Sequence, residues 1–255
     1  MINSSNELKE IYMATVVEHY EKHLAAYYSW LFGDFSAAVE SNRQFFILHK
    51  LLPGKSNIAI DLGAGCGFGS IALAKLGFKV LAFDLSQTLL DELKSKSGNL
   101  EITPIKDNIL NFTAHCPEGV ELCVCMGDTL THLESFDDAR HLFADVYNSV
   151  RTGGKFVLVF RDYIFELKDT DRFIPVKSDS NTIFTCFIEY FEGYVLVNDI
   201  VYSRTPQGWK LDVSSYKKLR IPADWVRREL IELGFTITFF TKDKGMITLI
   251  ACKNN

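Results

Sequence analysis

The chain has 255 residues, of which 47% are hydrophobic, and its 27 Lys and Arg against 32 Asp and Glu give a formal net charge of −5. This composition is typical of a folded protein with one large domain or one domain and an insertion. No apolar run reaches the roughly 18 residues of a membrane span, and no Lys/Arg tract offers the basic face that nucleic acids require. The opening residues lack a secretory signal. We therefore expect a soluble, cytoplasmic protein that binds neither membranes nor nucleic acid.

The cysteines and histidines give no metal-binding pattern. The 6 cysteines are scattered, without a Cys-x-x-Cys pair. Cys123 and Cys125 would share one face of a strand, but no second pair or neighbouring histidine completes a tetrahedral ligand set. His19 and His23 have helical spacing, but the residues between them differ from those of a metalloprotease motif. We therefore expect no metal, and we expect buried cysteines that act as small apolar side chains.

The N-terminal fifth of the chain, residues 1–53, predicts helices, because apolar residues recur there at intervals of three and four. Asp34 or Ser36 is expected to cap a second helix that runs to about Leu52, where a Pro-Gly pair breaks the pattern.

From residue 57 onward, short β-type runs alternate with helical windows. Strands that are joined by helices predict right-handed crossovers and a parallel sheet. Ser135 is expected to cap the helix before the last of these strands, and Gly153 to end it. The expected strands are residues 57–62, 79–84, 100–105, 120–126 and 155–160.

A second kind of pattern begins later in the chain. Three long β-type runs separated by turn residues predict an antiparallel meander over residues 176–219. A helix that begins near Pro222 follows, and then two final strands joined by a polar turn. We therefore divide the chain into a helical N-terminal lid (1–53), a core (54–175 and 220–255) and a β insertion over the active site (176–219).

The most informative stretch is DLGAG at residues 61–65, where an apolar strand ends in a carboxylate and leads into a glycine-rich turn. Glycines permit positive φ and let a ligand approach the backbone closely. The dinucleotide pattern G-x-G-x-x-G fails here, because its third glycine would fall on Phe68. A carboxylate at Asp61 suits a cationic or amino-bearing ligand better than a pyrophosphate. The alternative is that Asp61 only caps the following helix.

Further polar residues follow the next two strands. Asp84 ends the second strand, about twenty residues after the glycine turn, where an acid would accept hydrogen bonds from ribose hydroxyls. Asp107, Asn108 and Ile109 follow the third strand, where an adenine amino group would bind. Both acids also have a plainer interpretation as helix N-caps, although Ser86 is equally available for that role beside Asp84.

Four segments in order resemble the motifs of class I S-adenosylmethionine-dependent methyltransferases: DLGAGCG at 61–67, Asp84, KDNI at 106–109 and RTGGKFVLV at 151–159. The resemblance covers roughly residues 57–160 and 220–253, and glycine and sarcosine N-methyltransferases are looser relatives of this kind. It implies an α/β fold with a Rossmann-like, doubly wound, mostly parallel seven-stranded sheet and an antiparallel last strand. The helical N-terminal lid and a three-stranded antiparallel insertion would complete this fold.

The resemblance also implies S-adenosylmethionine as the cofactor and assigns roles to further residues. The segment after the fourth strand would contact the cofactor and present Thr129 and His132 to the substrate, with His132 either a structural histidine or a catalytic base. Aromatic rings of the N-terminal segment would face the positive sulfonium. The expected cofactor-binding residues are Asp61, Gly63, Ala64, Gly65, Asp84, Leu85, Asp107, Asn108, Ile109, Met126 and Tyr28, and the expected catalytic residues are Arg161, His132 and Tyr20.

Arg161 follows the fifth strand, and its guanidinium fork would orient a substrate carboxylate. The alternative is a surface ion pair with Asp162 or Glu166. The resemblance thus implies in-line methyl transfer from S-adenosylmethionine to a small molecule, with a carboxylate-bearing acceptor as one option. Such an enzyme can act by aligning the acceptor with the methyl group and by excluding water from both. An NAD(P)-linked oxidoreductase and a non-catalytic S-adenosylmethionine-binding protein are the alternatives. The expected assembly is a monomer or a homodimer.

Overall fold

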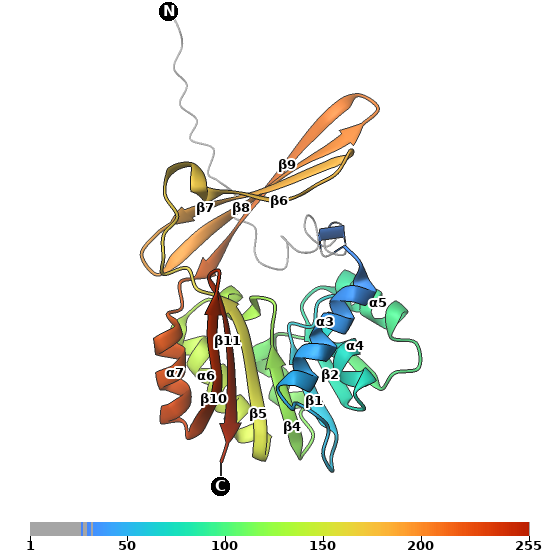
Figure 1. Ribbon diagram of the computed structural model, residues 1–255, viewed down its shortest axis with the longest axis vertical. Coiled ribbons are helices and arrows are strands. Elements are labelled where there is room, and N and C mark those ends of the chain that lie inside the picture. Colours follow the sequence, from blue (N-terminus) through green and yellow to red (C-terminus); the bar gives the residue numbers. More distant parts are fainter. Residues whose placement is uncertain (1–26, 28–29, 32, 255) are drawn as a thin grey trace, which may run out of the picture.

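The computed structural model describes residues 27, 30, 31 and 33–254, which form an α/β core beneath a smaller antiparallel sheet (Figure 1). The helices are α3 (Phe35–Leu48), α4 (Phe68–Lys75), α5 (Gln87–Ser97), α6 (Phe136–Ser149) and α7 (Ala223–Glu232), with 3-10 turns η2 (Ile109–His115), η3 (Thr129–His132) and η4 (Asp169–Arg172). The core strands are β1 (Ile58–Leu62), β2 (Lys79–Asp84), β3 (Ile102–Lys106), β4 (Val120–Cys125), β5 (Val150–Arg161), β10 (Phe235–Asp243) and β11 (Met246–Lys253).

The core sheet has seven strands in the order β10-β11-β5-β4-β1-β2-β3. Strands β1 to β5 pair in parallel, whereas β11 is antiparallel to both β5 and β10. This confirms the predicted mostly parallel, seven-stranded sheet with an antiparallel last strand. The chain winds from β1 toward β2 and β3 on one side and returns through β4 on the other. Open sheets of this kind bind ligands at the carboxyl ends of the strands beside that switch point.

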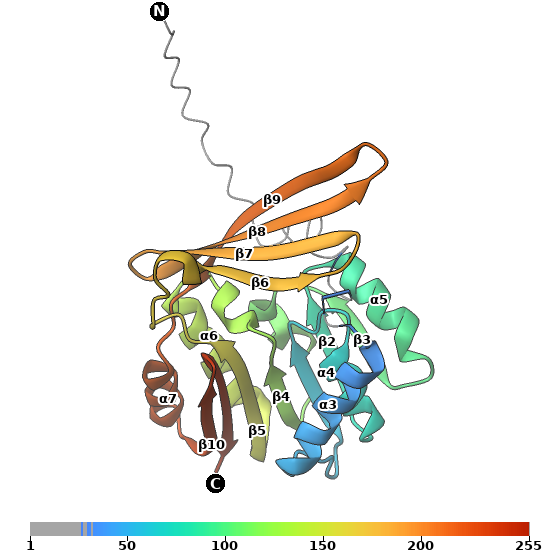
Figure 2. The ribbon, with the colours of Figure 1, turned by 45° about the horizontal axis from the view of Figure 1, so that its top comes forward.

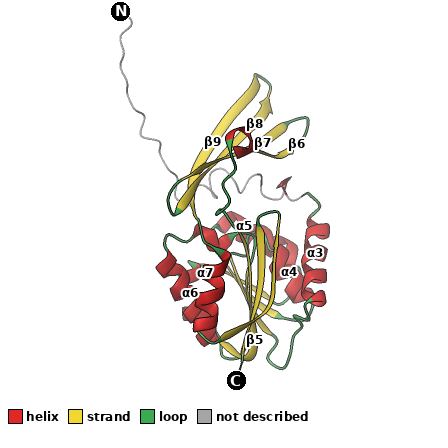
Figure 3. Ribbon diagram, turned by 60° about the vertical axis from the view of Figure 1, so that its left-hand side comes forward, coloured by secondary structure: helices red, strands yellow, loops and turns green. Residues whose placement is uncertain are grey.

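Helices cover both faces of the core sheet (Figure 3). On one face, α6 and α7 contribute to a hydrophobic cluster with the sheet. On the other face, α3, α4 and α5 contribute to a second cluster. All six residues of β4 are buried, as expected for a parallel strand with both faces covered. Cys123 and Cys125 lie in this strand, so the prediction of buried cysteines holds there. All 6 cysteines are described, and none of them forms a disulfide.

Two of the predicted helix starts are confirmed and two helix ends are wrong. Asp34 accepts hydrogen bonds from the Ser36 and Ala37 amides, and Ser135 accepts one from Asp138. The second helix ends at Leu48 rather than near Leu52, because Lys50 adopts a φ of 54° that a helix cannot continue. The helix before β5 ends at Ser149, with Val150 already extended, so Gly153 does not end it.

The insertion has four strands, so the prediction of three was wrong. They are β6 (Phe173–Ser178), β7 (Thr182–Tyr190), β8 (Tyr194–Thr205) and β9 (Gly208–Leu219), in sequential antiparallel order. The additional strand β6 lies at the edge of the sheet, and its register shifts at Pro175. Proline has no amide hydrogen for a ladder and is tolerated at a sheet edge, which explains why this short run lacked a strand signal.

The insertion lies over the carboxyl ends of the core strands (Figure 2), and its strand β9 packs against η3 of the core. Described parts of the N-terminal segment pack against the insertion: Tyr27 and Trp30 contact the cluster of Phe184 and Val201. The Trp30 indole also donates a 2.7 Å hydrogen bond to Asp179. Tyr20, Tyr28, His19 and His23 lie outside the described residues. Among the helices that are described, none has the length and apolar character needed to cross a membrane.

Candidate active site

The glycine-rich turn follows β1 at the predicted position. The Gly63 and Ala64 amides donate hydrogen bonds of 2.9 and 2.8 Å to the Phe83 carbonyl, which fixes the turn against the end of β2. Gly63 has a φ of 82°, and a Cβ added there would lie 2.2 Å from the Thr129 hydroxyl oxygen. Only glycine therefore lets the turn and the loop after β4 approach so closely.

Asp84 links the end of β2 to this turn. One carboxylate oxygen accepts a 2.8 Å hydrogen bond from the Gly65 amide, and the other accepts a 2.9 Å bond from the Ser86 amide. Ser86, and not Asp84, caps α5 through its hydroxyl, which accepts from Leu89. Asp84 and Leu85 remain partly exposed at the strand end. Asp84 thus faces the turn, as a ribose-binding acid would.

Asp61 lies underneath the turn and is only 3% exposed. The Ser70 hydroxyl, in the first turns of α4, donates a 2.6 Å hydrogen bond to its carboxylate. Burial raises the pKa of Asp61 to about 6, and the nearby Asp84 charge adds to the rise, against the lowering effect of Ser70. A negative charge at this position is therefore costly and would be favoured by a cationic ligand above the turn.

Replacing Asp61 by asparagine is expected to change how stability depends on pH. Between its ordinary pKa of 3.8 and the raised value of about 6, Asp61 holds a proton in the folded state that the unfolded chain releases. Stability of the unliganded protein should therefore fall as the pH rises through this window, by about 3 kcal/mol from this group. Asp61→Asn should remove that fall when urea unfolding is measured from pH 4 to pH 7. An exposed-site control, Asp137→Asn, should keep it; identical pH profiles for the Asp61 variant and the wild type would contradict the assignment.

The residues predicted to lie beside adenine surround the start of η2. Asp107 accepts hydrogen bonds from the Asn108 amide and the Asn111 side chain, and it lies 3.0 Å from a His115 ring nitrogen. These contacts, with the Asn111 hydrogen bond the largest, lower the pKa of Asp107. Asn108 caps η2, so the capping role considered for Asp107 belongs to its neighbour. Ile109 is buried directly after them.

The loop after β4 holds a buried polar centre that sequence reasoning missed. Asp128 is 6% exposed, and it accepts hydrogen bonds from the Arg161 amide at 2.7 Å and the Tyr163 hydroxyl at 3.1 Å. The Lys218 ammonium, which comes from β9, lies 2.5 Å from the same carboxylate. Burial raises the pKa of Asp128, but the charge and hydrogen bond of Lys218 outweigh that effect, so the pKa is lowered. This centre joins the insertion to the core.

The same loop carries the predicted substrate-facing residues. Thr129 donates a 2.9 Å hydrogen bond to the Met126 carbonyl, which places both beside the glycine turn. The His132 ring stacks on Tyr216 of the insertion, with centroids 5.6 Å apart. The structure thus brings His132 between the core and the insertion.

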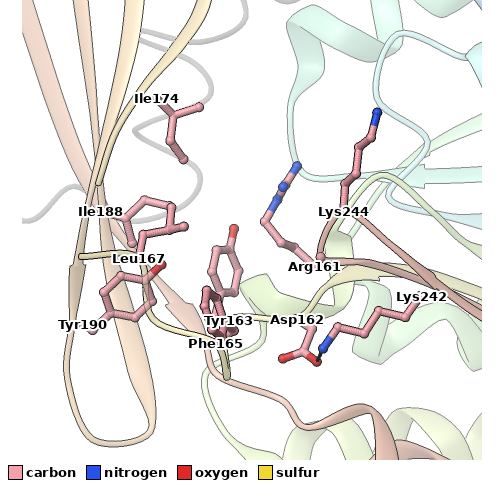
Figure 4. A pocket seen from close by; sticks show the side chains of 11 residues that line it. Arg161, Asp162, Tyr163, Phe165, Leu167, Ile174, Ile188, Tyr190, Lys242 and Lys244 are labelled. Carbon is pink, nitrogen blue, oxygen red and sulfur yellow. Dashed lines mark hydrogen bonds and ion pairs between the residues drawn. The ribbon is translucent and has the colours of Figure 1, made fainter. Parts of the chain in front are cut away.

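Arg161 ends β5 and lines a cavity between the core and the insertion (Figure 4). Asp162 pairs with Lys242 at 2.7 Å, and Glu166 pairs with Arg220 at 2.8 Å. Both acids that were considered as surface partners are therefore bound to other cations. Within the described part of the chain, no carboxylate forms an ion pair with the Arg161 guanidinium.

The matches with known proteins agree with this geometry. Residues 59–154 match the family model described as a methyltransferase domain. A glycine/sarcosine N-methyltransferase from Aphanothece halophytica is 28% identical over 129 residues, which are 50% of this chain and 48% of that protein. The corresponding enzyme from Halorhodospira halochloris is 30% identical over 134 residues, or 51% of this chain and 49% of that protein. The chain thus spans about half the length of these curated relatives.

Solved structures share the fold. An S-adenosylmethionine-dependent methyltransferase from Clostridium acetobutylicum aligns with a TM-score of 0.72 at 17% identity, over 92% of this chain and 99% of that one. The amino pentose methyltransferase CalS10 from Micromonospora echinaspora aligns with a TM-score of 0.71 at 12% identity, over 90% of this chain and 95% of its own.

The sheet order defines a doubly wound α/β domain, a kind of fold that binds ligands at the carboxyl edge of its sheet, where the glycine turn and Asp84 lie. The matched methyltransferase domain covers this same turn and its strands. Residues 59–154 thus match a methyltransferase domain, and the fold is the one seen in S-adenosylmethionine-dependent methyltransferases, which together support a class I enzyme of this kind.

Proposed function

We propose that this chain transfers a methyl group from S-adenosylmethionine to a small molecule by direct in-line displacement. The observation that carries the proposal is the left-handed glycine turn held by the Asp84 carboxylate. Residues 61–70 contain the buried Asp61 and no Lys or Arg. Such a turn favours a ligand with a ribose and cationic groups over one with a pyrophosphate, which would meet a carboxylate instead of a cation.

The residues present fit this cofactor. Asp84 would accept hydrogen bonds from the ribose hydroxyls, and Asp107 with Asn108 would lie beside the adenine. When bound, S-adenosylmethionine supplies a methyl group that is activated by the positive sulfonium. The chain itself would orient the acceptor and exclude water, because the insertion covers the strand ends. His132 is our candidate for holding a proton that leaves the acceptor.

The acceptor is proposed to be a small molecule that Arg161 holds by a carboxylate. The relatives described above are named for glycine and sarcosine, and CalS10 is described as an amino pentose methyltransferase, which supports a small acceptor. At the end of β5, the Arg161 guanidinium has no carboxylate partner among the described residues, which supports a carboxylate ligand. We further propose that the protein acts in the cytoplasm as a monomer or a homodimer.

Ligand binding and methyl transfer test the proposed function. In calorimetry, we expect S-adenosylmethionine to bind and NAD to give no heat. Incubation with radiolabelled S-adenosylmethionine and mixtures of small amines, acids and alcohols should then yield a methylated product. Binding of NAD in preference to S-adenosylmethionine would favour the oxidoreductase. Binding of S-adenosylmethionine without transfer to any acceptor would favour the non-catalytic alternative.

Replacing Arg161 by lysine is expected to lower methyl transfer at least about tenfold. The variant keeps the positive charge but loses the planar fork that grips a carboxylate at two points. Affinity for S-adenosylmethionine and the melting temperature should remain those of the wild type. Arg204→Lys, on an exposed position of β8, is the matched control and should keep full activity. Full activity of Arg161→Lys on a carboxylate acceptor would overturn the role of the fork.

A further inference from the structure

The cavity beside Arg161 is larger than a minimal acceptor requires. Its volume is about 380 Å³, and it lies between β6 and β7 of the insertion and the turn that joins β10 to β11 (Figure 4). Small-molecule sites in proteins have volumes of roughly 300–1,000 Å³, so this space falls within their range. An acceptor the size of glycine would leave more than half of the space unfilled.

The wall formed by the insertion is apolar. Ile174 and Ile188 project from β6 and β7, and Leu167 and Tyr190 lie beside them (Figure 4). Ile188 belongs to the buried cluster of the insertion, and Ile174 packs against that cluster while remaining half-buried. This wall can bury hydrocarbon, and it contributes no charged group.

The opposite wall carries positive charge. Arg161 and Lys244 stand on this side, across the cavity from Ile174 (Figure 4). Asp162 is the one carboxylate among the described lining residues, and it is bound to Lys242 at 2.7 Å and to the Ile164 amide at 2.8 Å. The charge of Lys242 is therefore balanced within the wall, whereas no carboxylate among the described lining residues balances the charges of Arg161 and Lys244.

Arg161 lies between the glycine turn and the cavity along the order of the strands. Arg161 ends β5, which is separated from β1 and its glycine turn by β4 alone. Strand spacing is about 4.8 Å, so β1 and β5 are about 10 Å apart in the direction perpendicular to the strands. The cavity lies on the other side of Arg161, towards β11 and the insertion.

We propose that the acceptor is an amphiphilic anion whose hydrophobic body fills this cavity. Its anionic group lies at Arg161 and Lys244, its body lies against Ile174 and Ile188, and its nucleophilic atom faces the glycine turn. This inference rests on the proposed function and specifies the acceptor further. A carboxylate and a phosphate would present the same chemistry to the two cations, and the test separates them.

The test measures binding of simple amphiphiles to protein saturated with S-adenosylhomocysteine. Butanoate, hexanoate and octanoate form the carboxylate series, and octyl phosphate and octylamine have the same chain with other head groups. We expect affinity to rise roughly fourfold with each methylene, which corresponds to about 0.8 kcal/mol. Octylamine should not bind. Comparison of octyl phosphate with octanoate shows which anion the cations prefer.

Two variants with matched controls locate the binding. Ile174→Asn should weaken octanoate binding at least tenfold and leave butanoate nearly unchanged, because it removes only apolar wall. Val213→Asn, on the exposed face of β9, is its control. Lys244→Asn should weaken all the anions about threefold, and asparagine tolerates the φ of 46° at that position. Lys210→Asn, on exposed β9, is the charge control.

The outcomes separate this inference from the proposed function. Affinity that is independent of chain length, or equal binding of octylamine, would overturn the proposal that the acceptor is an amphiphilic anion. Binding of S-adenosylhomocysteine in the same experiment would still support the proposed cofactor. An Ile174→Asn variant with unchanged chain-length dependence overturns the location. A protein that binds the amphiphiles but neither S-adenosylmethionine nor S-adenosylhomocysteine overturns the proposed function and this acceptor with it.

Discussion

Replacing Lys218 by methionine is expected to lower the free energy of unfolding by about 3–5 kcal/mol at neutral pH. The side chains of Lys218 and Asp128 are 10% and 9% exposed, so removal of the cation leaves a carboxylate charge buried. The remaining hydrogen bonds to the Asp128 carboxylate come from the Arg161 amide and from the Tyr163 and Thr131 hydroxyls, which offer dipoles rather than an opposite charge. Urea unfolding of the variant should show a lower midpoint with an unchanged slope.

Three comparisons make this prediction specific. Lys217→Met, at the exposed neighbouring position, should cost less than about 1 kcal/mol. A double variant with Asp128→Asn should recover much of the loss, because no charge is then buried without a partner. In the single variant the pKa of Asp128 should rise, so its destabilisation should shrink as the pH falls and the carboxylate takes up a proton. A loss below about 1 kcal/mol in Lys218→Met would show that water reaches the pair.

Replacing Asp84 by alanine is expected to weaken S-adenosylmethionine binding by about 1.5–3 kcal/mol, which is roughly tenfold to a hundredfold in affinity. The carboxylate is positioned both to accept from a ribose and to hold the Gly65 amide, so the variant loses a ligand contact and a support of the turn. Calorimetry on the folded variant is the measurement.

A companion variant separates the two losses. Asp84→Asn keeps an acceptor oxygen for the Gly65 amide but removes the charge, so its affinity should lie between those of the wild type and Asp84→Ala. Asp91→Ala, on an exposed position of α5, should bind like the wild type. Unchanged affinity in a folded Asp84→Ala protein would mean that another residue receives the ribose.

Local signals in the sequence were sufficient for most of the core. The strands near residues 58, 79, 102, 120 and 155 are β-type runs bounded by turn residues, and each was found within a few residues of its bounds, apart from the early start of β5. The caps at Asp34 and Ser135 are also local, because a side chain contacts amides two or three residues away. Where one proline weakened a short edge strand, as Pro175 does in β6, the local signal disappeared.

In the candidate site, local signals predicted some residues but missed a contact between distant parts of the chain. Glycine spacing and an acid at each strand end were enough to predict the turn and Asp84, since both depend on where strands end. The Asp128–Lys218 pair joins residues 90 positions apart, and nothing in either neighbourhood marks Lys218 as the inward-facing lysine of its pair. The position of Asp128 could have indicated a role in the site, because it follows β4 closely. Asp61 and Asp84 likewise lie at or near the ends of their strands.

The contact between Gly63 and Thr129 has a thermodynamic consequence for the two ligands. Thr129 is adjacent to Asp128, and Asp128 holds the backbone of Arg161, so one short loop touches both the glycine turn and the residue proposed to grip the acceptor. A shift of this loop on binding of one ligand would change the free energy of binding of the other. Because such coupling is reciprocal, the factor by which the acceptor then changes the affinity for the cofactor would equal the factor by which the cofactor changes the affinity for the acceptor.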